Sequence, residues 1–216
     1  MAPDASSSVQ PGGIAISPNG SLVAVVLGQT GTQVFPFSAG SSSPIGMAYS
    51  PTIKPYGSAG ASVAVAVDPQ NRLLYIGETA AFNSNTNSGA LRVFAVGSNS
   101  LSELSYSTPY APAGTGPHAI LPASSGSYVY AASWQSGSAG VITGYSVTAS
   151  GLTALGTSAA TGTQPNGLAA DSTGNYVLAV SSSGTTFDAY TLASGQLASS
   201  LASSPVSNPI AIVAAP

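Results

Sequence analysis

The sequence contains no cysteine and very little charge. Without cysteine, the chain has no disulfide and no thiolate to serve as a nucleophile or metal ligand. Its 216 residues include three cations, which are Lys54, Arg72 and Arg92. A nucleic-acid-binding surface needs clustered cations to neutralise phosphates, so three scattered ones exclude it. The apolar runs have the length of strands, far below the roughly 20 residues of a membrane helix, so no membrane span is expected.

Familiar catalytic and targeting motifs are also missing. The chain has no Gly-x-Ser-x-Gly, no His-Glu-x-x-His and no phosphate-binding Gly-x-x-x-x-Gly-Lys sequence. Its one histidine is His118, so no metal or other cofactor is expected. The first residues lack the basic and apolar regions of a signal peptide, so none is predicted within this chain.

What is present is a pattern of short apolar strands that recurs along the chain. Each copy has an apolar run, a turn rich in Pro, Asn, Ser, Asp or Gly, and a second apolar run. The copies occupy residues 12–28, 62–79, 117–134 and 165–182, and a partial fifth copy begins at Pro209. Their starts recur about every 44 to 55 residues, a spacing typical of propeller blades.

Two further strands follow in each copy, so each copy predicts a four-stranded antiparallel blade. In the first copy the fourth strand is predicted at Ile45–Tyr49. We therefore predict an all-β fold, a β-propeller of about four blades with one extra strand. The predicted parts are a polar tail at 1–10, blades at about 11–60, 61–115, 116–163 and 164–207, and a closing strand within 208–216.

Several of these stretches resemble the lactonase-like, YVTN-type bacterial β-propellers, which include 6-phosphogluconolactonase-like proteins. They are IAISPNGS from Ile14, VAVDPQNR from Val65 and GSYVYAAS from Gly126, with a similar Ser-Gly-Leu-Thr turn at Ser150. The resemblance covers nearly the whole chain and implies a seven-bladed ring. It therefore predicts that the four blades are part of that ring and that this chain is a fragment; a self-contained smaller ring is the alternative.

Blade geometry predicts which residues gather at the central funnel. The loop that enters a first strand and the loop that leaves a second strand lie at the same end of a propeller. His118, Asn166 and Asn208 hold entering positions, whereas Glu78 and Trp134 follow second strands. We therefore predict that His118 and Glu78 form a catalytic pair, because a neutral imidazole can activate water near pH 7. Trp134, Asn166 and Asn208 are predicted to bind a ligand.

The family resemblance implies a His, a Glu and an Arg at this face in lactone-processing relatives. His118, in the sequence Pro117-His118-Ala119, matches the Pro-His step of that family. The second His that often follows is replaced here by Ile120. Arg92 lies inside a third strand and is not expected to reach the funnel. Each candidate also has a structural interpretation: His118 as a hydrogen-bonded strand residue, Glu78 as a solubilising strand end, and Trp134 as packing between blades.

Two functions remain open. The near absence of ionisable side chains favours a non-enzymatic propeller, a secreted, periplasmic or cell-surface scaffold that binds a protein, glycan or small molecule at the funnel. The alternative is a lactonase-like hydrolase with His118 as general base. Its substrate would be a neutral lactone, because a phosphorylated one requires several Arg or Lys side chains.

Overall fold

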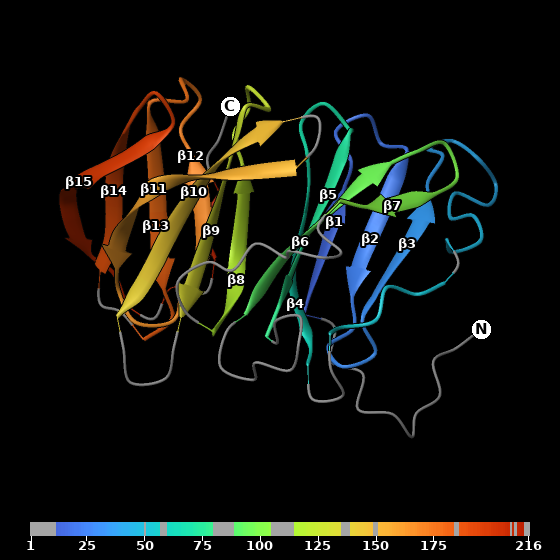
Figure 1. The fold of residues 1–216 in the computed structure, drawn as a ribbon, viewed down its shortest axis with the longest axis horizontal. Coiled ribbons are helices and arrows are strands. Elements are labelled where there is room, and N and C mark those ends of the chain that lie inside the picture. The colour runs from blue at the N-terminus through green and yellow to red at the C-terminus, as the bar shows by residue number, and fades with distance from the viewer. Residues whose placement is uncertain are drawn as a thin grey trace.

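Four small antiparallel sheets stand side by side in the computed structural model (Figure 1). The structure describes residues 12–49, 51–56, 60–79, 89–104, 115–134, 139–148, 151–183, 186–207, 209 and 211–213. Within these ranges all regular structure is β-strand and there is no helix. In particular, the described residues include no helix of the length and apolarity needed to cross a membrane. The all-β propeller predicted from the sequence is confirmed.

Within each sheet, the strands are hydrogen-bonded in the order of the sequence. The first sheet has three strands and the other three have four. The strands of the first two sheets are β1 (Gly13–Ile16), β2 (Leu22–Val26), β3 (Thr32–Pro36), β4 (Ser62–Val67), β5 (Leu73–Glu78), β6 (Ala90–Val96) and β7 (Leu101–Glu103). Those of the last two are β8 (Thr115–Pro122), β9 (Tyr128–Trp134), β10 (Gly140–Thr148), β11 (Gly151–Thr161), β12 (Pro165–Ala170), β13 (Tyr176–Ser181), β14 (Thr186–Ala193) and β15 (Gln196–Pro205).

The hydrophobic core lies between the sheets rather than within them. Side chains alternate across a strand, so each sheet presents one apolar face to each neighbour. Leu22 and Ile76 belong to the cluster between the first and second sheets. Tyr75 packs between the second and third, and Tyr130 between the third and fourth. Each blade therefore depends on its neighbours to bury its side chains.

The fourth strand predicted at Ile45–Tyr49 is wrong. This part of the first blade runs beside β3 but meets it through isolated contacts, the bridges Phe37–Ile45 and Thr32–Ile53 and a 2.7 Å bond from the Tyr49 N–H to the Val34 carbonyl. Prolines at 44, 51 and 55 interrupt it, and a proline has no N–H to donate to a ladder. The result is an irregular segment that borders the second blade.

Two further features concern the ends of the described chain. Of the closing strand predicted within 208–216, residues 208, 210 and 214–216 lie outside the described residues, and 211–213 adopt no regular strand. A Cβ added to Gly167 would lie 3.2 Å from the Ile212 nitrogen, so residues 211–213 run beside β12.

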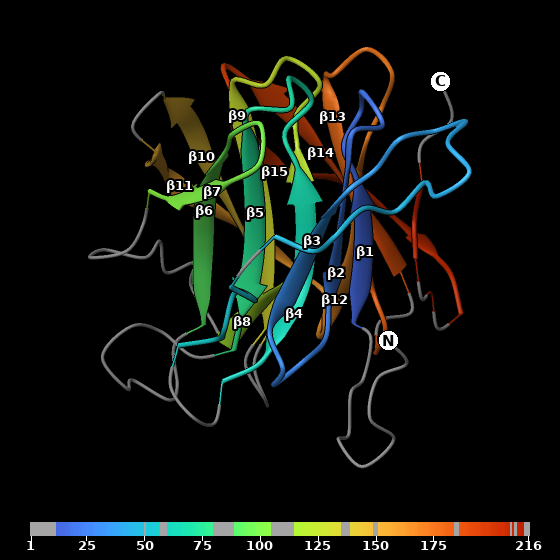
Figure 2. The ribbon, with the colours of Figure 1, turned by 90° about the vertical axis from the view of Figure 1, so that its right-hand side faces the viewer.

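At the other end of the described chain, Ile14 and Ile16 of β1 are 66% and 57% exposed. Figure 2 views the molecule from this first blade.

Candidate functional site

First strands begin and second strands end at the same end of the molecule. The pairing shows this directly, because Ser62 faces Glu78, Pro117 faces Ser133 and Pro165 faces Ser181. Among the described residues, the positions predicted to surround a funnel therefore share one end of the propeller: Glu78, His118, Trp134 and Asn166.

A β-bulge lies near the start of three of the first strands. The pairing skips Val63 in β4, His118 in β8 and Asn166 in β12. A bulge leaves one residue out of the ladder and changes the direction of its side chain. All three skipped residues line a cavity of about 480 Å³ that runs along the four first strands. In three of the four blades, the bulge thus presents one side chain to this cavity.

A second, smaller cavity adjoins this one at His118 and Asn166. Its volume is about 180 Å³, and its lining residues are His118, Trp134, Gln164, Pro165, Asn166 and Ser182. The structure therefore brings together three of the predicted site residues: His118, Trp134 and Asn166. Asn208, which was also predicted to bind a ligand, lies outside the described residues.

The contacts in this pocket are aromatic and neutral-polar. The His118 and Trp134 rings meet edge to face, with their centroids 6.2 Å apart and their planes at 70°. The Asn166 amide donates to the Pro209 carbonyl at 3.3 Å. On the facing side, the Ser182 and Ser183 hydroxyls donate to the Gln164 side-chain oxygen at 3.2 and 2.7 Å. None of the six lining side chains is an acid, a lysine or an arginine.

Burial lowers the pKa of His118 below its usual value of 6.5. Desolvation disfavours the imidazolium, and the shift has no contribution from a neighbouring carboxylate. His118 is therefore a neutral imidazole at pH 7, which is the form that can accept a proton from water.

Glu78 does not join this group. Leu74, Ile76 and Glu78 alternate along β5, and the first two pack against the first blade. Glu78 points to that same face: it accepts a 2.8 Å bond from Arg92 Nη1 and a 3.0 Å bond from the Tyr56 N–H. His118 belongs to the third blade, on the opposite side of β5. The predicted pairing of His118 with Glu78 is therefore not formed.

Glu78 instead belongs to a buried charge cluster that the sequence analysis did not predict. Arg92 Nε and Nη2 bind the Glu103 carboxylate at 2.8 and 2.7 Å, and Nη1 also donates to the Lys54 carbonyl at 2.7 Å. The guanidinium carbon lies 4.1 Å from the centre of the Tyr56 ring. One sequence signal was available, an arginine inside the apolar strand ALRVFAV of a chain that has few charges.

The electrostatics of this cluster are those of a buried ion network. Burial raises the pKa of Glu78, although Arg92 acts in the opposite direction. For Arg92, burial lowers the pKa, but the bonds to Glu103 and Glu78 outweigh it and leave the pKa raised. The guanidinium therefore stays charged and is committed to these partners.

The start of β8, just before His118, packs directly on Gly77. A Cβ added to Gly77 would lie 2.3 Å from the Pro117 carbonyl oxygen, so a substitution must move one of the two strands. We expect Gly77→Ala to lower the free energy of unfolding by about 1–3 kcal/mol, the usual cost of overpacking. Chemical denaturation measures it. Gly13→Ala is the control, because nothing lies within 4 Å of a Cβ there; equal losses in both variants would refute the packing argument.

Comparison with known proteins places this geometry in a family. Residues 14–214 match the model of the lactonase family, described as a seven-bladed β-propeller. None of the curated protein sequences compared with the chain matches it.

Solved structures with the same fold carry related names. Two are named "putative 6-phosphogluconolactonase": that of Bacteroides uniformis (18% identity, TM-score 0.71) and that of Bacteroides fragilis (16%, 0.71). The third is the periplasmic gluconolactonase of Pseudomonas aeruginosa (21%, 0.71). The alignments cover 97%, 94% and 93% of this chain, but 60%, 57% and 55% of those chains.

These comparisons correct the function that the sequence favoured. The expectation of a non-enzymatic binding scaffold is wrong, because the family match and the gluconolactonase neighbours support the lactonase alternative instead. At these identities the neighbours establish the fold, whereas the family rests on a match along nearly the whole chain. The chain belongs to the lactonase family of seven-bladed β-propellers.

Proposed function

We propose that the protein hydrolyses a neutral lactone, with His118 as the general base. The observation that carries the proposal is the placement of His118: in a chain of the lactonase family, a bulge turns this one neutral imidazole toward the shared wall of two cavities.

The chemistry follows from the residues of the small pocket. The imidazole of His118 accepts a proton from water as the water oxygen attacks the lactone carbonyl carbon. The ring oxygen then leaves as a hydroxyl group, taking a proton from the imidazolium, so that the product is the open hydroxy acid. Trp134 provides an apolar wall for the lactone ring, and Gln164 and Ser182 provide neutral polar contacts.

The absence of acidic, lysine and arginine side chains from the lining of the small pocket indicates which kind of lactone it can bind. A phosphoryl group is bound by arginine or lysine side chains or by converging backbone N–H groups. The six residues of the small pocket include no cation, so we propose a lactone without phosphate. A periplasmic location, as for the Pseudomonas aeruginosa neighbour, is part of the proposal and is tested by cell fractionation.

The test is hydrolysis of glucono-δ-lactone, followed in a pH-stat against the spontaneous rate. We expect kcat/KM to rise with pH through a midpoint below 6.5, because the neutral form of His118 is the active one and burial lowers its pKa. Adding a 6-phosphate to the substrate should not improve kcat/KM. The proposal would be refuted if the rate equalled the spontaneous rate with every neutral lactone tried. It would also be refuted if the acid limb of the pH profile were centred above pH 6.5.

A further inference from the structure

A third cavity lies on the outer side of the second blade, away from the His118 pocket. Its volume is about 520 Å³, within the roughly 300–1,000 Å³ typical of small-molecule sites. It shares no lining residue with either cavity at the centre of the propeller. Any ligand bound here would therefore not compete directly with a substrate at His118.

The cavity exists because the first blade lacks a regular fourth strand. Tyr49 and residues 51–54 of the irregular segment form one wall, and β6, β7 and the turn between them form the other. The Tyr49 hydroxyl reaches across to the Ser98 carbonyl at 3.3 Å and links the two walls. The cavity thus lies between two walls that this bond connects.

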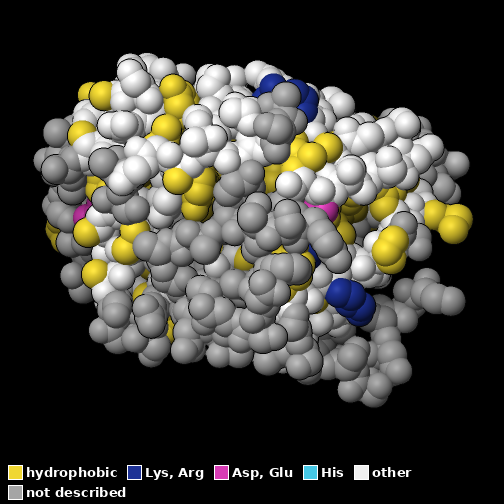
Figure 3. Space-filling view, in the orientation of Figure 1, with side chains coloured by type: hydrophobic (Ala, Val, Ile, Leu, Met, Phe, Trp, Pro, Cys, Tyr) yellow, Lys and Arg dark blue, Asp and Glu magenta, His cyan; other side chains and the backbone are white. Residues whose placement is uncertain are grey.

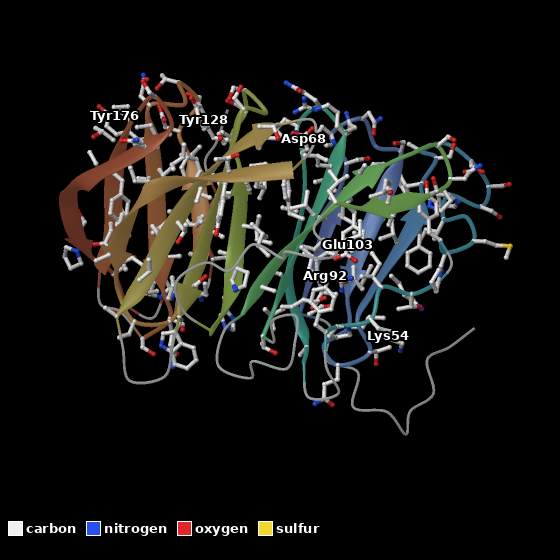
Figure 4. The ribbon with its side chains drawn as sticks, in the orientation of Figure 1. Lys54, Asp68, Arg92, Glu103, Tyr128 and Tyr176 are labelled. Atoms are coloured by element: carbon white, nitrogen blue, oxygen red, sulfur yellow. The ribbon has the colours of Figure 1, made fainter. Side chains whose placement is uncertain are left out.

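Most of the lining is apolar, with charge at one side. Tyr49, Ile53, Phe94 and Leu101 provide aromatic and aliphatic surface. The charged lining residues are Lys54, Arg92 and Glu103; Figure 4 shows Arg92 and Glu103 beside each other and Lys54 below them. Such a combination suits a ligand that has an apolar body and one charged end.

The hydrogen bonds among the charged lining residues indicate the sign of the charge that a ligand would carry at this side. Glu103 and Glu78 both pair with Arg92, and the remaining Nη1 bond goes to the Lys54 carbonyl. These groups therefore satisfy one another. The ammonium of Lys54 is exposed and donates one bond, to the Thr30 carbonyl at 3.2 Å. Since an ammonium has three N–H donors, Lys54 retains the capacity to bind an anion.

We propose that this cavity binds a small monocarboxylate with an aromatic or aliphatic body, whose carboxylate is held by Lys54. One lysine balances the single negative charge of a carboxylate but not the higher charge of a phosphate. Figure 3 shows that few charged side chains, coloured dark blue or magenta, lie on this face of the molecule.

The probe is 3-phenylpropionate, with its uncharged amide as the matched ligand, titrated into the protein by isothermal calorimetry. We expect saturable binding of the acid, weakened by salt, and at least about fivefold weaker binding of the amide. Lys54→Gln should reduce affinity for the acid by about fivefold and bring it level with that of the amide. Because Lys54 is exposed, this variant should fold normally and keep its lactonase activity.

Two further variants separate this cavity from the central one. Asn99→Asp adds a negative charge to an exposed lining position and should weaken the acid but not the amide. His118→Gln should bind the acid as the parent does. If neither probe binds saturably, if Lys54→Gln and Asn99→Asp bind the acid as the parent does, or if His118→Gln abolishes binding, the proposal is overturned.

Discussion

Replacing His118 with glutamine should lower kcat/KM for lactone hydrolysis by a factor of about 10²–10⁴, the usual contribution of a general base. Glutamine keeps a polar side chain of similar reach but cannot accept a proton near neutral pH. The residual activity should also lose its acid limb, because the group whose protonation caused it is gone. Initial rates measured from pH 4.5 to 8 give both quantities.

A structural role for His118 predicts a different outcome. If the ring only packs against Trp134, the glutamine variant would lose stability but keep the pH profile of the parent. Thermal unfolding of the variant is therefore measured alongside its activity. Trp134→Phe is the companion variant, because it keeps an aromatic wall beside His118 and should change KM more than kcat. An unaltered pH profile in His118→Gln would show that another group acts as the base.

Replacing Arg92 with leucine should lower the free energy of unfolding by about 3–5 kcal/mol, the cost of breaking a buried ion pair. Glu78 is fully buried, and Arg92 supplies its charged partner at 2.8 Å. Without the guanidinium, the carboxylate must either stay charged in an apolar interface or take up a proton. Equilibrium denaturation at pH 7 measures the loss.

The second variant in this experiment removes the stranded charge. Serine stands at the position equivalent to Glu78 in the third and fourth blades, as Ser133 and Ser181. Arg92→Leu combined with Glu78→Ser should therefore be more stable than Arg92→Leu alone. Arg72→Leu is the comparison variant: the Arg72 side chain is 51% exposed, and the buried carboxylate of Asp68 keeps its bond from the Arg72 backbone N–H, so this variant should lose less stability than Arg92→Leu. Comparable losses for Arg72→Leu and Arg92→Leu would contradict the assignment of a buried network.

The sequence by itself determined the blades. Short apolar runs separated by turns at Asn19–Gly20, Gln70–Asn71 and Ser125–Gly126 specify antiparallel pairs, because alternation and turn chemistry act over a few residues. The end of the propeller at which His118, Trp134 and Asn166 gather was also predictable. A residue just before or after a strand of known direction can only lie at one end of its blade.

The tertiary structure alone decided which way these side chains point and what they meet. The bulge at His118 depends on how β8 pairs with β9, and no local sequence pattern predicts this bulge. Strand alternation predicts that Glu78 shares a face of β5 with Leu74 and Ile76. It does not predict that the first blade, rather than the blade of His118, covers that face. Arg92 and Tyr56, the partners of Glu78, are 14 and 22 positions away, and contacts at such separations form only when strands pair and blades pack.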